Sequence, residues 1–318
     1  MASVKKYNPN LKTNNDTGFG INVRDYGGRF INKNGTFNLR REGIALLNKF
    51  SIYQRMLSLP SWKFIAVIAL FYFFVNILFS LVYLAIGTDQ LQGILAKTSW
   101  NKFKEVFYFS TQTFTTVGYG RINPMGDSAN LVASIEAASG FLSFAVATGL
   151  IYGRFAKPKS YLAFSDLALI GPYKDITGLM FRFASYKDNH ILTNVEIKVN
   201  LALQVEENGK QVFKFYDLPL ERSKVDSLSM NWTVVHPINE DSPLQGYAYD
   251  DLKTGDVELY ILITGFDDIY SSRVLQRTSY TYEEIKMNAK FAPMYTESED
   301  GKSTILQMHK LNEIIEFG

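Results

Sequence analysis

The chain has 318 residues, a formal net charge of +2 and no cysteine. The missing cysteines exclude disulfides, thiol catalysis and cysteine-ligated metals, and so small a net charge gives no basic face of the kind that binds nucleic acid. Hydrophobic residues make up 47% of a chain long enough for two compact units. Residues 1–43 are polar, and we expect no cleavable signal peptide there.

An amphipathic segment follows at residues 44–59. Its apolar residues recur at roughly helical spacing between Asn, Lys, Gln and Arg; they are Ala45, Leu46, Phe50, Tyr53, Met56 and Leu57. This pattern predicts a helix that lies on the membrane surface. Pro60 separates it from the next segment.

The first membrane span is predicted at residues 62–86. From residue 64 to residue 86 the chain carries no charge, and Asn76 and Ser80 are its only clearly polar residues. A bilayer core of ~30 Å needs about 20 apolar residues in a helix. The alternative is the buried helix of a soluble protein, but such a helix rarely lacks a charged face for so long. Trp62 and Lys63 occupy the end of the span, where interfacial anchors belong.

The second span is predicted at residues 128–155 and is rich in Ala, Ser and Gly, which suit close helix packing. It contains Glu136, which either faces protein or water inside the membrane or is solvated near the helix end. Between the spans, residues 103–114 are too short to cross the bilayer. They predict a helix that enters the membrane and returns, because irregular backbone at that depth is tolerated only inside protein or beside a cavity.

Positive charge sets the orientation of the two spans. Eight Lys and Arg residues lie between positions 24 and 63, and Arg154, Lys157 and Lys159 end the second span. The loop between the spans carries only four, so both termini are predicted to be cytoplasmic, with the spans in the cell (inner) membrane.

The run TTVGYG at residues 115–120 follows the short helix, and Thr116, Val117, Gly118, Tyr119 and Gly120 match the potassium selectivity filter. Glycines allow successive carbonyls to point the same way. Potassium ions are then held by the carbonyl oxygens of residues 116–119, and the hydroxyl of residue 116 adds an innermost ring of oxygens. Val117 and Tyr119 are expected to point away from the ions. One chain supplies a quarter of such a filter, so a homotetramer follows. No other cofactor is expected.

The remaining residues, 159–318, change character. Residues 195–205 carry an apolar residue at every odd position, which predicts a half-buried strand. A hairpin turn at residues 207–210 precedes a return strand at 211–216, and further short strands are predicted at 179–183, 232–238 and 257–264. Many short strands of this kind predict a β-sandwich. The histidines, His190, His236 and His309, are scattered, and no catalytic constellation emerges, so we expect no enzyme.

With these runs the chain resembles the inwardly rectifying potassium channels, and most closely their prokaryotic branch. The resemblance covers the chain from about residue 29 onward. It is carried by RFINKNGTFN (29–38), FSTQTFTTVGYG (109–120), GRFAKPK (153–159), HPINEDSPL (236–244) and ITGFDDIYSSRVLQRTSYTYEEI (263–285). It implies an α + β membrane protein with two spans, a re-entrant pore helix with its filter, and an immunoglobulin-like cytoplasmic β-sandwich.

The resemblance also implies residue roles. Gly140 matches a flexible glycine of the inner helix, or else a glycine that allows close packing, and Tyr152 matches an aromatic gate at the inner-helix crossing. Residues 265–272 match a loop that narrows the cytoplasmic pore, with Gly265, Phe266 and Ser271 as gate residues. The basic cluster Arg154, Lys157 and Lys159, with Trp62 and Lys63, matches a surface through which anionic lipids modulate gating, or else serves topology alone.

Three positions depart from the family pattern. Gln112 and Ile122 stand where many members place an ion pair behind the filter, so the filter must be braced differently in this chain. Phe144 stands where strong rectifiers carry a cavity acid, which predicts weak block by magnesium or polyamines. Glu136 faces either the cavity or the filter support.

The sequence thus predicts a cytoplasmic segment at 1–43, a surface helix at 44–59, a pore domain at 60–158 and a β-sandwich domain at 159–318. The predicted function is a potassium-selective channel of the inward-rectifier type. The alternative is a membrane-anchored β-sandwich that binds a ligand without conducting ions, but a mere anchor needs neither the filter run nor the re-entrant helix.

Overall fold

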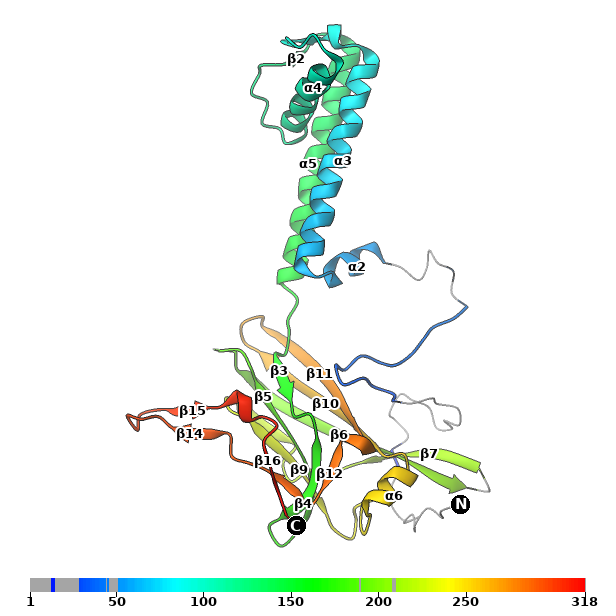
Figure 1. The fold of residues 1–318 in the computed structure, drawn as a ribbon, viewed down its shortest axis with the longest axis vertical. Coiled ribbons are helices and arrows are strands. Elements are labelled where there is room, and N and C mark those ends of the chain that lie inside the picture. The colour runs from blue at the N-terminus through cyan, green and yellow to red at the C-terminus, as the bar shows by residue number, and fades with distance from the viewer. Residues whose placement is uncertain are drawn as a thin grey trace. The chain divides into compact units, whose positions relative to one another are not determined.

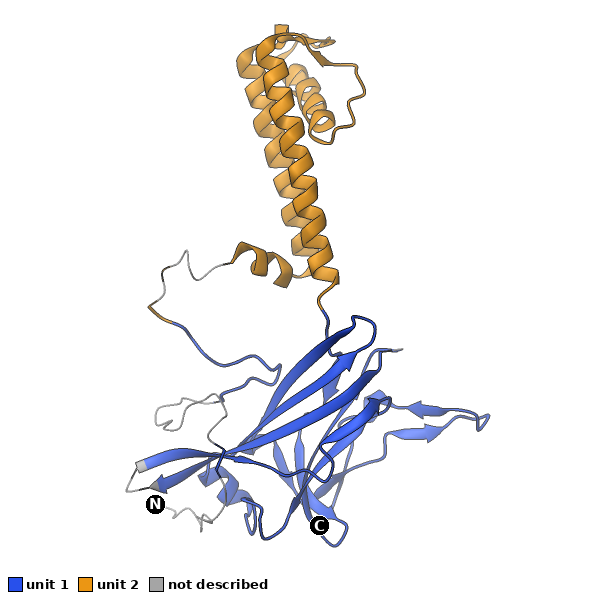
Figure 2. Ribbon diagram, turned by 180° about the vertical axis from the view of Figure 1, so that it is seen from behind, with its two compact units in different colours: residues 1–41, 158–318 blue, residues 42–157 orange. Residues whose placement is uncertain are grey.

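The computed structural model describes residues 13–14, 29–43, 45, 51–188, 190–207 and 210–317. The chain divides into two compact units, which Figures 1 and 2 show. Unit 1 comprises Met1–Arg41 and Pro158–Gly318, and unit 2 comprises Glu42–Lys157.

Unit 2 is helical. Its described helices are α2 (Ile52–Ser58), α3 (Ser61–Ile86), α4 (Ser99–Phe114) and α5 (Asp127–Phe155). α3 and α5 run side by side, and the shorter α4 lies against one end of the pair (Figure 1). Beside α4, the short strands β1 (Leu91–Gln92) and β2 (Asn123–Pro124) pair antiparallel. α3 and α5, with 26 and 29 residues, are long and apolar enough to cross a membrane.

The burial pattern of α3 is inverted relative to a helix of a soluble protein. It buries the polar side chains of Asn76 and Ser80, whereas the apolar side chains of Leu70 and Phe74 are exposed by 68% and 65%. The exposed apolar face of α3 suits contact with lipid hydrocarbon, and its buried polar groups are available for contacts between helices.

Two helix starts differ from the sequence prediction. α4 begins at Ser99 rather than at residue 103, because the Thr98 hydroxyl accepts a hydrogen bond from Asn101 N and caps the helix. The surface helix predicted at residues 44–59 is described only over Ile52–Ser58, where the Ser51 hydroxyl caps it. Residue 44 and residues 46–50 lie outside the described residues.

Unit 1 contains two five-stranded sheets. One has the order β11-β10-β6-β7, with β8 also pairing with β6; these strands are β6 (Leu192–Glu207), β7 (Lys210–Asp217), β8 (Lys224–Leu228), β10 (Glu258–Asp267) and β11 (Ser272–Thr281). The other has the order β12-β4-β5-β3, with β9 also pairing with β5; these strands are β3 (Leu162–Phe164), β4 (Ala168–Tyr173), β5 (Ile176–Ser185), β9 (Trp232–Ile238) and β12 (Ile285–Met287).

The remaining elements of unit 1 are short. Strand β13 (Ala289–Phe291) pairs with β16 (Ile314–Glu316), and β14 (Tyr295–Glu297) pairs with β15 (Thr304–Leu306). Helix α6 (Tyr249–Thr254) precedes β10. Among the described strands, every pair is antiparallel except β12 with β4.

A single core joins the two sheets. It contains Leu179 and Phe181 from β5 and Ile197, Leu201 and Ile261 from the facing sheet. Alternate residues of β6 enter this core, as its period of two predicts. The fold of helices plus a C-terminal β-sandwich is therefore confirmed. The predicted strands correspond to parts of β5, β6, β7, β9 and β10, whereas the predicted turn at 207–210 includes residues 208 and 209, which lie outside the described residues.

Residues 29–38, which we call the N-terminal strap, pack on the β-sandwich rather than forming a separate segment. Phe30 enters a cluster of aromatic rings formed by Phe213, Phe215 and Tyr260. Arg29 forms an ion pair with Glu284, with Nη2 2.6 Å from the carboxylate. The strap therefore belongs to unit 1, although more than a hundred residues separate it from its partners in sequence.

The C-terminal strands are held by a buried cation. The Arg182 side chain on β5 is 2% exposed, and its guanidinium donates hydrogen bonds to the backbone carbonyls of Ala292 (2.6 Å), Lys310 (2.7 Å) and Leu311 (2.8 Å). It also lies over the Phe291 ring, with its central carbon 4.5 Å from the ring centroid. Burial lowers the pKa of Arg182 to about 10, so the group remains a cation at neutral pH.

Arg182→Met should destabilise unit 1, because the variant removes the hydrogen bonds that Arg182 donates to the carbonyls of Ala292, Lys310 and Leu311. The Lys310 carbonyl keeps a second donor, Glu313 N at 3.1 Å. We expect a loss of about 2–4 kcal/mol in the free energy of unfolding. The measurement is urea unfolding of the full-length protein in detergent, followed by the fluorescence of Trp232, which packs against Phe183. The control Lys174→Met removes a cation from an exposed ion pair with Glu221 and should leave unfolding unchanged. Equal free energies of unfolding for the Arg182 variant and the parent would contradict the stabilising role of Arg182.

Candidate functional site

The backbone of the TTVGYG run alternates in handedness. Thr116, Gly118 and Gly120 have φ values of 58°, 52° and 78°, whereas Val117 and Tyr119 between them have negative φ. This alternation turns successive peptide units toward the same side, whereas in a strand they would alternate. A Cβ added at Gly118 would meet no described atom within 4 Å. The residue is therefore needed for its backbone angle and not for space.

The inner part of the run is held by the C-terminal end of α4. The Gln112 carbonyl accepts hydrogen bonds from Val117 N (2.9 Å) and Gly118 N (3.3 Å), and the Thr113 carbonyl accepts one from Thr116 N (3.0 Å). Carbonyls in the last turn of a helix have no amide donor from a following turn, and the run supplies amides to these two. The run thus caps α4, and α4 in turn orients the run.

The outer end of the run is held by a second set of contacts. The Asn123 side-chain amide donates to the Gly120 carbonyl at 2.8 Å. Arg121 Nη1 lies 3.4 Å from Glu105 Oε1, and the other carboxylate oxygen of Glu105 accepts from Leu95 N at 3.0 Å. These contacts join the end of the run to the start of α4 and to the preceding loop.

This arrangement supplies the different bracing that Gln112 and Ile122 imply. Ile122 is 7% exposed and packs in an apolar cluster with Tyr83 and Phe109. The charged contact is shifted by one residue to Arg121, and its acid comes from Glu105 in the second turn of α4. Sequence reasoning missed Glu105 and Asn123, because nothing in their local pattern distinguishes them from solvated polar residues.

A buried polar cluster lies behind α4 and joins three helices. The Glu136 carboxylate on α5 accepts hydrogen bonds from Tyr83 Oη on α3, at 2.7 Å, and from Ser110 Oγ on α4. Ser110 Oγ also lies 3.1 Å from the Asn76 side-chain oxygen. The Glu136 side chain is fully buried. Glu136 is therefore buried between the helices and does not line the cavity described below, so its assignment to the cavity is wrong.

Gly140 provides close packing. A Cβ there would lie 1.8 Å from the carbonyl oxygen of Phe114, the last residue of α4. Only glycine lets α5 approach the base of the run this closely. A Cβ at Gly149 on the same helix would meet no described atom within 4 Å. The structure thus favours the packing role for Gly140 over the flexible one.

A cavity of about 810 Å³ lies below the run within unit 2. Its walls include Thr116 at the inner end of the run, Gly140 and Phe144 on α5, and Phe71 on α3. Phe144 is 73% exposed, and Tyr152, further along α5, is 74% exposed. Phe144 therefore lines this cavity together with Thr116, whereas Glu136 does not line it.

The loop predicted at residues 265–272 is shorter than expected. Gly265 and Phe266 belong to β10 and Ser272 begins β11, so the connection contains only residues 268–271. The pairing of β10 with β6 is irregular at Gly265. Ser271 in the turn has a φ of 47°. We call residues 267–272 the apex hairpin; the placement of Gly265 and Phe266 in a loop is wrong, because both continue the ladder with β11.

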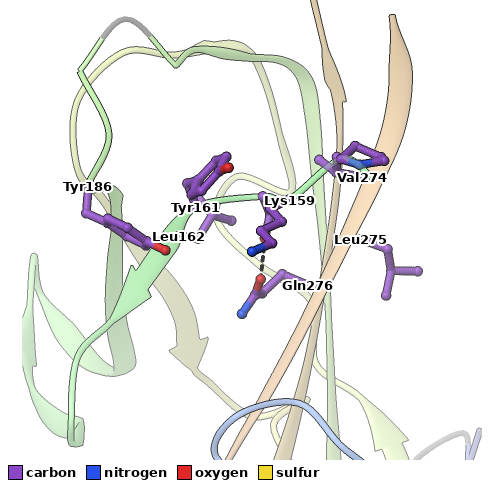
Figure 3. A pocket seen from close by; sticks show the side chains of 9 residues that line it. Lys159, Tyr161, Leu162, Tyr186, Val274, Leu275 and Gln276 are labelled. Atoms are coloured by element: carbon purple, nitrogen blue, oxygen red, sulfur yellow. Dashed lines mark hydrogen bonds between the residues drawn. The ribbon is translucent and has the colours of Figure 1, made fainter. Parts of the chain in front are cut away.

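The basic cluster is not uniform. Arg154 Nη2 donates to Ser61 Oγ at 3.1 Å, and its guanidinium lies over the Phe64 ring, so it ties the end of α5 to the start of α3. Lys63 lies over the ring of Trp62. Lys159 borders a pocket of about 310 Å³ in unit 1, with Tyr161, Tyr186 and Gln276 around it (Figure 3).

Comparison with known proteins decides the family. A model for ion channels matches residues 64–157, and a model for the C-terminal domain of inward rectifier potassium channels matches residues 162–317. The chain is 33% identical over 290 residues to the inward rectifier potassium channel Kirbac3.1 of Paramagnetospirillum magnetotacticum, covering 90% of this chain and 95% of that protein. The chain belongs to the inward rectifier potassium channel family.

Animal relatives are more distant. The ATP-sensitive inward rectifier potassium channel 12 of Gallus gallus is 25% identical over 319 residues, covering 90% of this chain and 72% of that protein. The human inward rectifier potassium channel 4 is 26% identical over 227 residues, covering 67% of this chain and 50% of that protein. The protein is thus a membrane-embedded potassium channel and not an enzyme, and the alternative of a non-conducting anchored module is set aside.

Gly140→Ala should damage the pore by pushing α5 away from the Phe114 carbonyl. We expect lower thermal stability of the detergent-solubilised channel together with loss of potassium flux in liposomes. The matched control Gly149→Ala should match the parent in both measurements, because its Cβ meets open space. Unchanged stability with altered open probability in Gly140→Ala would instead show that the residue acts as a hinge.

Proposed function

We propose that four copies of this chain form a homotetrameric pore in which residues 116–120 select potassium. The observation that carries the proposal is the alternating sign of φ at Thr116, Gly118 and Gly120. Four such segments around one axis would present rings of carbonyl oxygens to a dehydrated ion. In this proposal potassium occupies sites between the carbonyls of Thr116, Val117, Gly118 and Tyr119, and no other cofactor takes part.

The proposed gate has two parts. Tyr152 is an exposed aromatic residue near the end of α5, and four copies would form an apolar constriction that closes by dewetting. The apex hairpin, with the exposed Ile269 and with Ser271 in its turn, would form a second constriction in the cytoplasmic pore. Gly140 contributes to the first part by setting the packing of α5 against α4.

Anionic lipids are the proposed modulators. Trp62 and Lys63 begin α3, and Lys157 follows α5, so these residues suit the cytoplasmic face of a bilayer. Because Arg154 is already engaged with Ser61 and Phe64, its contribution is positioning. Lys159 borders the pocket of Figure 3, where aromatic walls and one cation suit a lipid phosphate. The protein would lie in the cell membrane with both termini cytoplasmic, as the distribution of Lys and Arg implies.

Gly118→Ala should abolish potassium selectivity. A Cβ disfavours the positive φ of this residue by about 1–3 kcal/mol per subunit, so the carbonyls around it lose their alignment. We expect the potassium-to-sodium permeability ratio to fall about tenfold or more, while a tetramer persists on size-exclusion chromatography. A variant with the parent's selectivity would refute the filter assignment.

Phe144→Asp should create strong, voltage-dependent block by cytoplasmic spermine. The parent offers no charge at this cavity position, so a polyvalent cation there is poorly compensated and block by spermine or magnesium is weak. Four new carboxylates should lower the spermine concentration for half-block about tenfold or more. The control Phe144→Asn changes shape without adding charge. Current–voltage recordings in bilayers decide, and no gain in the Asp variant would show that residue 144 does not face the ion path.

A further inference from the structure

A buried pair of side chains joins the apex hairpin to a second loop of unit 1. His190 Nε2, in the loop between β5 and β6, lies 2.9 Å from Asp267 Oδ2 at the end of β10. The two side chains are only 4% and 1% exposed. A buried carboxylate needs hydrogen-bond donors that compensate its charge, so this pair is not an incidental surface contact.

The other oxygen of Asp267 holds the turn of the hairpin. Oδ1 accepts hydrogen bonds from Ile269 N at 2.9 Å and from Tyr270 N at 3.2 Å. The next residue, Ser271, has a φ of 47°, a conformation that costs a non-glycine residue free energy. The Asp267 carboxylate therefore restrains the turn through Oδ1 and binds His190 through Oδ2.

The loop that carries His190 is itself anchored. The Ser185 hydroxyl donates to the His190 carbonyl at 3.1 Å, and the ring of Tyr161 packs edge-on against the imidazole with 4.9 Å between centroids. Tyr161 lies just before β3, and it also contacts Tyr186. Three segments far apart in sequence thus meet at His190: the residues before β3, the loop between β5 and β6, and the apex hairpin.

The His190 side chain makes one polar contact among the described residues. Its Nδ1 has no hydrogen-bond partner among the described residues, so Nε2 makes its only polar side-chain contact there, the one to Asp267. Tyr161 packs against the imidazole. Tyr161 also raises the pKa of Tyr270, as does Asp267, whereas Lys159 lowers it. The imidazole thus serves as a donor that keeps the carboxylate turned inward.

We propose that His190 is a positioning residue that holds the apex hairpin in one conformation through Asp267. Without this donor, Asp267 would be a buried and under-compensated charge, and it would turn toward solvent. The amides of Ile269 and Tyr270 would then lose their acceptor and the turn would become mobile. The consequence for ion flow rests on the proposed gate, since a mobile hairpin would no longer narrow the pore at a constant width.

The test compares two variants of the full-length channel reconstituted in liposomes. His190→Leu removes the donor, whereas His190→Gln keeps an amide that can donate to Asp267. Asp188→Asn is the matched control, because it removes a charge from an exposed position in the same loop. Hydrogen–deuterium exchange followed by mass spectrometry reports on residues 268–271 and, as a reference for intact folding, on β5.

In His190→Leu we expect exchange at residues 268–271 to be at least about tenfold faster, with β5 unchanged, while His190→Gln and Asp188→Asn match the parent. Equal exchange at the hairpin in His190→Leu and the parent would overturn the proposal, as would failure of His190→Gln to restore protection. Potassium flux in the same liposomes tests the gate separately: we expect basal flux to at least double in His190→Leu alone. A mobile hairpin with unchanged flux would support the positioning role of His190 and refute the hairpin as a gate.

Discussion

The hydrogen bonds that the Gln112 carbonyl, at the end of α4, accepts from the filter run are the interaction on which the ion path depends. This carbonyl receives two successive amides of the filter run and thereby starts the alternation of φ at Thr116 and Gly118. A potassium ion must exchange its hydration shell for oxygens at closely similar positions, so small movements of this backbone matter. The outer contacts from Asn123 and Arg121 hold the opposite end of the same run.

The rest of unit 2 maintains the position of α4. Gly140 lets α5 pack against the last carbonyl of α4. In a buried region between the helices, the Glu136 carboxylate accepts hydrogen bonds from hydroxyl groups of α3 and α4. Buried polar contacts of this kind are sensitive to the loss of one partner, because the remaining group has no solvent to turn to. The polar inside and apolar outside of α3 follow from the same requirement.

The sequence predicts those features that repeat locally, and it misses those that depend on distant partners. Uncharged length predicts α3, period-two alternation predicts β6, and the run from Thr116 to Gly120 predicts the filter. Glu136 and Tyr83 are 53 positions apart in the sequence, and His190 and Asp267 are 77 positions apart, so no local sequence pattern predicts these contacts. The predicted apex loop is too long for a related reason: the ladder between β10 and β11 continues to Asp267 and Ser272.

The measurement that tests the filter assignment most directly is the reversal potential of the native channel in a planar bilayer. With a tenfold potassium gradient balanced by sodium, the alternating carbonyl backbone of residues 116–120 predicts a reversal potential close to the potassium equilibrium value of about 59 mV in magnitude. A reversal potential near zero under the same gradient would mean that the pore passes both cations, and residues 116–120 would then not select potassium.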